Sequence, residues 1–240
     1  MKKILMVASV ALALSTQLMA YDLINDNEDF VIRIGMDLEG SQNDARNIIY
    51  DTEGNPTCGN GLCGKIGMDK DQAYELGFAL EKKVNDNEFG SRKLVTLYNY
   101  GDAKIHNGGL VTNNNNAGAE FTYEVFYKIK SYIKPYIGAG FGINRSTVDY
   151  EERDGRILDV SYDRNRIEYK PTLHVTLGLT GEIYKGFGYY ATYKYRYADT
   201  SETTIPFSGD REGVAGPYSK TVKVDGVDGG QWILGLSYQF

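Results

Sequence analysis

The chain has 240 residues, enough for one large domain or two small ones, and its formal net charge is −6. A mean hydropathy of −0.40 is too polar for a bundle of membrane helices, whereas 20 Tyr and abundant Val, Ile and Leu are too apolar for a disordered chain. The negative charge argues against a nucleic-acid-binding surface, for which a basic stripe is expected.

Residues 1–20 have the pattern of a secretory signal peptide. Two lysines precede an apolar run, Ile4–Leu14, and Ala20 is a small residue suited to cleavage before Tyr21. The run is too short for a spanning helix, which needs about 20 apolar residues. We therefore expect an exported chain whose mature domain covers residues 21–240.

The two cysteines, Cys58 and Cys63, lie close together in the sequence. In an oxidising compartment such a pair indicates a small loop disulfide, worth about 2 kcal/mol on the chain-entropy model. Free or metal-bound thiols remain the alternative, although His106 and His174 lie far from the pair in the sequence. No cofactor is expected.

The mature chain shows apolar residues at every second position, the period of a β-strand, and no sustained period of 3.6. Leu94-Val95 and Leu97-Tyr98 are adjacent apolar pairs, so the phase of the third segment stays open. In chain order the eight segments are Phe30–Glu39, Tyr74–Glu81, Arg92–Tyr100, Glu120–Lys128, Pro135–Asn144, Thr172–Thr180, Phe187–Tyr197 and Trp232–Phe240.

The connections between these segments alternate between long and short. We expect three short turns, at 85–88, 130–132 and 181–186, and four long polar loops, at about 40–71, 101–116, 145–165 and 199–229. Outer-membrane barrels have short periplasmic turns and longer extracellular loops. The pattern predicts an eight-stranded antiparallel up-and-down transmembrane β-barrel with both termini in the periplasm.

One face of the segments is apolar and the other carries charge and glycine. The lumen of an eight-stranded barrel is only wide enough for side chains to fill it, so we expect glycine, threonine and paired charges inside and bulky apolar residues against lipid. A closed sheet also leaves no unpaired edge in hydrocarbon. The charged residues assigned to the lumen are Arg33, Asp37, Glu75, Glu81, Glu120, Glu124, Lys194 and Arg196.

Three stretches and the signal peptide resemble the small outer-membrane barrels: opacity proteins, OmpX-like proteins and the membrane domain of OmpA. The stretches are Pro135–Gly142, Tyr189–Tyr197 and Trp232–Phe240. In that family a terminal Phe after alternating apolar residues is the signal read by the barrel-assembly machinery. The resemblance implies this role for Trp232, Leu234, Leu236, Tyr238 and Phe240. The chain stops at its last strand, so the peptidoglycan-binding domain of full OmpA-type proteins is absent from this sequence.

The lumen charges allow two interpretations. They are either a gate in a narrow channel or a paired plug that fills the lumen, and we favour the plug because eight strands leave little free bore. Removing one partner of a buried pair typically costs about 3–5 kcal/mol, which is the loss of stability predicted for Arg33→Leu.

His174 and Thr176 are both placed on the inward face of one strand. Some eight-stranded barrels are lipid-modifying enzymes with a His and a Ser two residues apart, but here the second residue is Thr and both point away from lipid. A hydrogen-bonded lumen histidine is the favoured interpretation. No Ser-His-Asp set and no His-Glu metal motif is present in the sequence.

These expectations favour a non-enzymatic, surface-exposed protein of the Gram-negative outer membrane, with roles in envelope integrity and adhesion-type contacts. A narrow porin-like channel is the second candidate and a lipid-modifying enzyme the third. We expect as partners outer-membrane lipid and lipopolysaccharide, the assembly machinery and extracellular ligands of the long loops. We expect no nucleic acid and a monomeric protein.

Overall fold

The computed structural model describes residues 27–38, 45–50, 64–66, 73–107, 110–152, 165–198, 201–207, 218–224 and 229–240. The predicted signal peptide and the Cys58–Cys63 pair lie outside these residues. Within them, no helix is long and apolar enough to cross a membrane.

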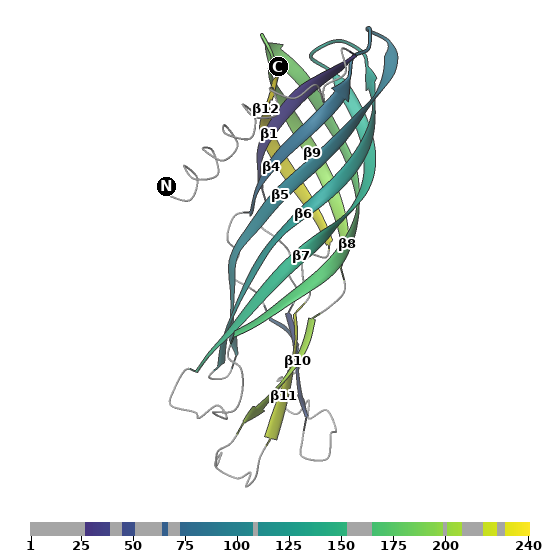
Figure 1. Ribbon diagram of the computed structural model, residues 1–240. Helices are drawn as coiled ribbons and strands as arrows, with labels where there is room; N and C mark the ends of the chain where they lie inside the picture. The colour runs from purple at the N-terminus through teal and green to yellow at the C-terminus, as the bar shows by residue number, and fades with distance from the viewer. Residues whose placement is uncertain are drawn as a thin grey trace.

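Eight strands form a closed antiparallel barrel, which confirms the predicted fold class (Figure 1). The order around the barrel is β1-β12-β9-β8-β7-β6-β5-β4, with β4 paired to β1. The strands are β1 (Glu28–Asp37), β4 (Ala73–Lys82), β5 (Glu88–Asn107), β6 (Leu110–Lys128), β7 (Lys134–Glu152), β8 (Asn165–Tyr184), β9 (Phe187–Ala198) and β12 (Gly229–Gln239).

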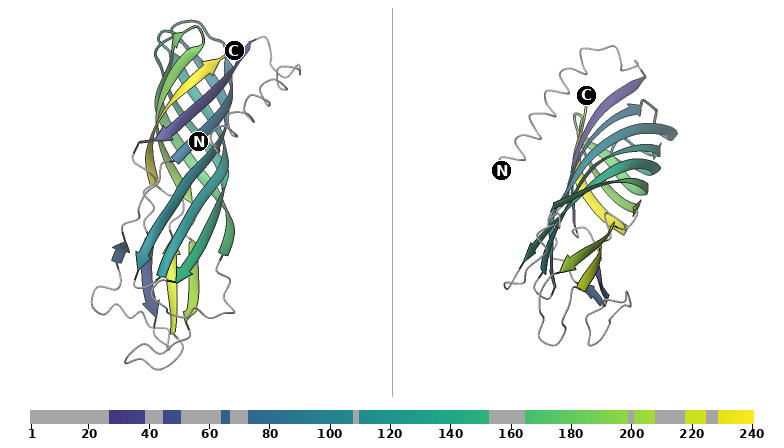
Figure 2. Two further views of the ribbon diagram at one scale, coloured as in Figure 1. Left: turned by 90° about the vertical axis from the view of Figure 1, so that its left-hand side faces the viewer. Right: turned by 60° about the horizontal axis from the view of Figure 1, so that its bottom comes forward.

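The barrel wall has a short half and a long half. β4, β1, β12 and β9 are neighbours of 10 to 12 residues, whereas β5, β6, β7 and β8 are neighbours of 19 or 20 residues. About 10 residues suffice to cross the hydrocarbon layer, so the long strands project well beyond it at one end. Figures 1 and 2 show this projection at the end opposite Phe240.

The expected loop at 101–116 is therefore mostly strand, and residues 145–152 and 165 of the expected loop at 145–165 also belong to strands, so the expectation of loops at these residues was wrong. Strand β5 runs to Asn107 and β6 starts at Leu110, while β7 continues to Glu152 and β8 starts at Asn165. Backbone pairing needs no apolar side chain, so a hairpin continues through polar residues that carry no alternation signal. Residues 113–116, a run of four asparagines, are one such stretch of β6.

The other two expected loops contribute a second sheet beyond the short half of the barrel. Its strands are β2 (Ala45–Tyr50), β3 (Gly64–Ile66), β10 (Ser201–Phe207) and β11 (Tyr218–Val224), in the order β10-β11-β2-β3. β2 and β3 follow β1, and β10 and β11 follow β9. Because β1 and β9 both flank β12, the two connections emerge side by side and can pair.

Side-chain exposure places apolar residues outside the barrel and charged residues inside it. Leu177 is 60 % exposed, whereas Glu124 and Lys194 are 1 % and 3 % exposed. A water-soluble barrel would reverse these values. The exposed apolar surface is the one that lipid covers in a transmembrane barrel.

The structure also resolves the phase of the third predicted segment. Arg92, Leu94, Thr96 and Tyr98 are buried, whereas Val95 and Leu97 on the same strand are exposed, so the first set faces the lumen. The adjacent apolar pairs hid this phase because an apolar residue occupies each face at these positions.

Candidate functional site

The lumen contains a set of ionised side chains drawn from six of the eight barrel strands. Five are cationic and five are anionic. The cations are Arg33, Arg92, Lys134, Lys194 and Arg196, and the anions are Asp37, Glu75, Glu81, Glu120 and Glu124.

Arg92 is the centre of the cluster near the short turns. Its Nε donates to Glu81 at 2.8 Å and its Nη1 donates to Glu124 at 2.6 Å. The ammonium of Lys134 donates to the second oxygen of Glu81 at 2.6 Å, and Arg33 donates to Glu124 at 3.3 Å. Each carboxylate therefore lies between two cations, the arrangement that keeps buried ions from being left unpaired.

Glu120 is the centre of the cluster nearer the long-strand end. It accepts hydrogen bonds from Arg196 and, at 3.1 Å, from Lys194. Lys194 also donates to Glu75 at 3.1 Å, and Arg196 donates to the side-chain oxygen of Gln231. This cluster links β4, β6, β9 and β12 across the lumen, so it fixes their relative positions as well as satisfying charge.

Aromatic rings separate and bridge the two clusters. Arg92 lies over Phe126 and Tyr136, with its guanidinium carbon 5.4 Å and 5.7 Å from the ring centroids. Arg33 lies over Tyr136 at 5.5 Å and over Tyr190 at 5.0 Å. The order Phe126, Arg92, Tyr136, Arg33, Tyr190 is thus an alternating column of rings and cations, in which each contact is a cation–π interaction.

The alternation in sequence placed Tyr190 on the same face as Lys194 and Arg196 but gave no role in the lumen to rings, and glycines explain why the rings fit. A Cβ at Gly35 would lie 2.1 Å from the Tyr190 hydroxyl oxygen, and one at Gly235, its partner on β12, would lie 2.3 Å from the same ring. A Cβ at Gly90 would likewise meet the ring of Phe126, one at Gly178 the ring of Tyr136, and one at Gly118 the ring of Tyr98. The missing side chains leave slots in the wall that the rings occupy.

The Tyr190 hydroxyl donates to Glu75 at 3.2 Å, so this ring connects the column to the second cluster. Tyr98 also contacts the second cluster, because the guanidinium carbon of Arg196 lies 4.6 Å from the centroid of its ring. The Tyr98 hydroxyl donates to Asn144 at 3.1 Å. Charges and rings together occupy the lumen between these residues.

His174 and Thr176 both lie inside the barrel, buried to 4 % and 3 % exposure. The Nε2 atom of His174 is 2.8 Å from the hydroxyl of Thr122, and its Nδ1 is 3.7 Å from Glu120. Neither side chain reaches the lipid-facing surface, where a lipid-modifying enzyme would need its nucleophile. Among the described residues no group of three metal-ligating side chains comes together.

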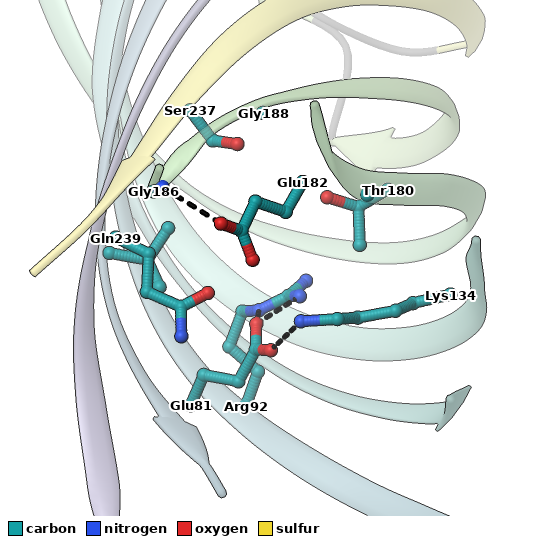
Figure 3. A pocket seen from close by; sticks show the side chains of 11 residues that line it. Glu81, Arg92, Lys134, Thr180, Glu182, Gly186, Gly188, Ser237 and Gln239 are labelled. Atoms are coloured by element: carbon teal, nitrogen blue, oxygen red, sulfur yellow. Dashed lines mark hydrogen bonds and ion pairs between the residues drawn. The ribbon is translucent and has the colours of Figure 1, made fainter. Parts of the chain in front are cut away.

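A small cavity lies in the lumen near the short-turn end (Figure 3). Its volume is about 20 Å³, which is room for one water molecule. Figure 3 shows Glu81 between Arg92 and Lys134, and Glu182 directed at the Gly186 amide, to which it accepts a 2.9 Å hydrogen bond.

The short turns carry exposed ion pairs of a different kind. Lys130 donates to Asp86 at 3.2 Å, and Lys128 lies 3.6 Å from the same carboxylate. The hydrogen bond from Lys130 holds the pKa of Asp86 below its usual value. These groups are open to solvent, which screens their attraction.

The structure thus places the residues assigned to the lumen from sequence inside the barrel, and it joins most of them in the two clusters. Asp37 is buried at the long-strand end of β1. Sequence reasoning missed Arg92 and Lys134. Arg92 lay on the strand whose phase was open, and Lys134 lay one residue before the expected strand start. A net excess of inward carboxylates in the predicted set was the signal that further cations were required.

The proposed assembly signal forms the outward face of β12. Trp232, Leu234, Leu236 and Phe240 are 47 %, 42 %, 68 % and 47 % exposed. Phe240 also packs against Phe30 and Tyr238, with ring centroids 5.9 Å and 4.7 Å apart. This packing buries Phe30, which the alternation assigned to the lipid-facing side.

No protein-family model matches the chain, and no curated protein matches its sequence. Solved structures do match. The outer membrane protein OprG from Pseudomonas aeruginosa is 16 % identical, with a TM-score of 0.51 over 90 % of this chain and 98 % of OprG. Ail, the attachment invasion locus protein of Yersinia pestis, is 16 % identical, with a TM-score of 0.44 over 89 % of this chain and 99 % of Ail. Neisserial surface protein A is 17 % identical, with a TM-score of 0.40 over 88 % of this chain and 97 % of that protein. The closed eight-stranded sheet and the match to OprG together show that this chain has the fold of the small outer-membrane β-barrels, the group that its sequence resembles.

Proposed function

We propose that this chain is a non-enzymatic integral protein of the bacterial outer membrane whose lumen is sealed and whose role is carried by its extracellular end. The observation that supports it most is the packed lumen, in which two ion-pair clusters and a column of rings cross the barrel among the described residues. A barrel that passes no solute contributes through its surfaces, which points to envelope integrity and contacts with other surfaces.

The shape of the exposed end supports this assignment. Four long strands and a separate four-stranded sheet extend past the apolar part of the barrel (Figure 1). Such an extension is the feature that surface contacts require, because it reaches beyond the lipid headgroups. We infer that the short turns and both termini face the periplasm, as in barrels with this loop asymmetry.

Single-channel recording in planar bilayers tests the sealed lumen. The wild-type protein is expected to insert without producing resolved conductance steps. Insertion is verified separately by the mobility difference between boiled and unboiled samples and by the fluorescence of Trp232, the single tryptophan, which lies on the lipid-facing side. Resolved steps from verified, folded protein would overturn this proposal in favour of a narrow channel.

A loop replacement tests where the role resides. In one variant, residues 39–72 and 199–228 are replaced by short glycine-containing turns, which removes the small sheet and leaves the barrel. Cells that carry this variant should show the same detergent sensitivity and surface attachment as cells that lack the protein, while the variant keeps its heat-dependent mobility. Full rescue by the shortened barrel would assign the role to the barrel itself.

A further inference from the structure

One outward-facing lysine lies inside the apolar belt of the barrel. Lys93 is on the outer face of β5, and its side chain is 55 % exposed. Its register partners are Leu80 on β4 and Tyr123 on β6, and the next outward residue of β5, Val95, is 44 % exposed. A charge at such a position is costly in a membrane, because acyl chains neither hydrate it nor supply a counter-ion.

The neighbouring rings of Phe89 and Tyr127 mark the edge of this belt at the short turns, with their centroids 4.9 Å apart. Phe89 precedes Lys93 by four residues on β5. A strand rises about 3.4 Å per residue and is tilted by about 45° in a membrane, so the Lys93 backbone lies about 10 Å deeper than that of Phe89. The ammonium therefore approaches the headgroups only if the side chain extends towards the belt edge.

The side chain of Lys93 does extend in that direction. Its ammonium donates to Glu28 at 3.3 Å, and Glu28 is the first residue of β1. Leu80 pairs with Phe30 on β1, so Glu28 lies two residues nearer the strand start than the residue in line with Lys93. Lys82 on β4 lies directly opposite Glu28, and β1, β4 and β5 are consecutive in the wall (Figure 1). Two cations therefore flank one carboxylate on the outer surface.

This group has one positive charge in excess and donors that Glu28 does not use. An ammonium carries three N–H groups, and among the described residues Glu28 is the acceptor that Lys93 contacts. The half-exposed side chain directs the other N–H groups outward, where acyl chains offer no acceptor. A phosphate group supplies both the negative charge and the acceptor oxygens that are needed here.

We propose that Lys82 and Lys93 bind the phosphate of an anionic glycerophospholipid in the leaflet at the short-turn end, with its acyl chains along the apolar residues of β4 and β5. The one positive charge in excess matches the single negative charge of such a headgroup. This surface lies at the opposite end of the barrel from the extension to which a role is assigned above. The leaflet is the periplasmic one, which rests on the proposed orientation of the short turns, whereas phosphate binding does not.

Native mass spectrometry of the full-length protein, refolded in detergent micelles and titrated with phosphatidylglycerol, tests this site. The test variant is Lys82→Gln with Lys93→Gln. The matched control is Lys130→Gln, because Lys130 is 53 % exposed and donates to Asp86 at 3.2 Å but lies in a turn beyond the belt. Glu28→Gln separates a phosphate site from a purely structural ion pair. Heat-dependent mobility of each variant verifies the barrel before binding is measured.

We expect the test variant to bind phosphatidylglycerol about tenfold more weakly than wild type, and Lys130→Gln to change the affinity less than twofold. Glu28→Gln should bind as tightly as wild type or more tightly, because it removes a negative charge beside the phosphate. Equal losses in the test and control variants, no loss in either, or a matching loss in Glu28→Gln would overturn the site. A lipid-free dimer that the test variant dissociates would also overturn it, in favour of a second copy of this chain.

These outcomes are independent of the proposed function. Loss of the lipid site would leave the sealed lumen standing, because the site lies on the outer surface of the wall. Resolved conductance steps would overturn the sealed lumen and leave the lipid site standing.

Discussion

Arg92→Leu is the substitution that best tests how the lumen is held together. The guanidinium of Arg92 donates to Glu81 and to Glu124, and it also lies between the rings of Phe126 and Tyr136. Leucine keeps an apolar contact with the rings but removes the charge. Glu81 is then left with Lys134, and Glu124 with Arg33 at 3.3 Å.

The size of the effect follows from the ion pairs that are lost. Arg92→Leu takes one cation from Glu81 and one from Glu124, so each buried carboxylate keeps a single cationic partner instead of two. Breaking a buried pair by removing one partner costs about 3–5 kcal/mol, because the charge that stays behind is less well compensated in a site without bulk water. We expect Arg92→Leu to lower the free energy of unfolding by this amount. We expect Arg33→Leu to lie at the lower end of the range, since Arg33 has one carboxylate partner and its Nε and Nη2 donate to no described residue.

Urea unfolding in lipid vesicles, followed by the fluorescence of Trp232, measures the difference by linear extrapolation. Lys83→Leu is the control. It removes the same charge from an ion pair with Asp29 in which the lysine is 52 % exposed, and such pairs contribute at most about 1 kcal/mol. The reasoning would be refuted if Arg92→Leu cost no more than Lys83→Leu, because the lumen charges would then be as well solvated as those in the turns.

Three further predictions concern other parts of the barrel. Gly35→Ala should destabilise the barrel by about 1–3 kcal/mol, because its Cβ would meet the Tyr190 ring, and Tyr190→Leu in the same chain should restore part of the loss in the same urea assay. His174→Ala should lower the urea midpoint, because the His174 side chain contacts Thr122 inside the lumen. Mass spectrometry should find the lipid A of cells that express the variant unchanged. A lipid A mass shift in cells with the wild-type protein, abolished by the variant, would reveal an enzyme. Because the pKa of Asp86 is lowered in the folded protein, its contribution to stability is present above the pKa of the unfolded state and is lost as the pH falls. The group is exposed, so Asp86→Asn should leave the urea midpoint unchanged at pH 7. A marked drop in the midpoint would contradict solvent screening of the turn pair.

The alternation of apolar and polar residues was sufficient to predict the barrel. In β8, the residues Leu173, Val175 and Leu177 are 61 %, 56 % and 60 % exposed, while Thr172, His174 and Thr176 between them are buried. A strand turns successive side chains to opposite faces, so one assignment of the apolar face to lipid decides the whole strand. The number of barrel strands and the presence of three short turns followed from the same pattern, although β8 runs to Tyr184 and the turn expected at 181–186 is only residues 185–186.

The partners of the lumen charges could not be predicted in this way. Arg92 and Glu124 are 32 residues apart in the chain and meet because β5 and β6 are neighbours with a specific register. Lys194 and Glu75 are 119 residues apart and meet across the lumen. Residue type shows that a buried charge needs a partner, but the tilt and stagger of the closed sheet determine which one it finds.

The sequence by itself determined that this chain forms strands with one apolar and one charged face, because the two-residue period and the polarity of each face are local properties of a few neighbouring residues. Only the tertiary structure decided that aromatic rings occupy slots beside glycines in the lumen and that two distant connections join as one four-stranded sheet, because ring placement and strand pairing depend on which segments closure of the barrel brings side by side.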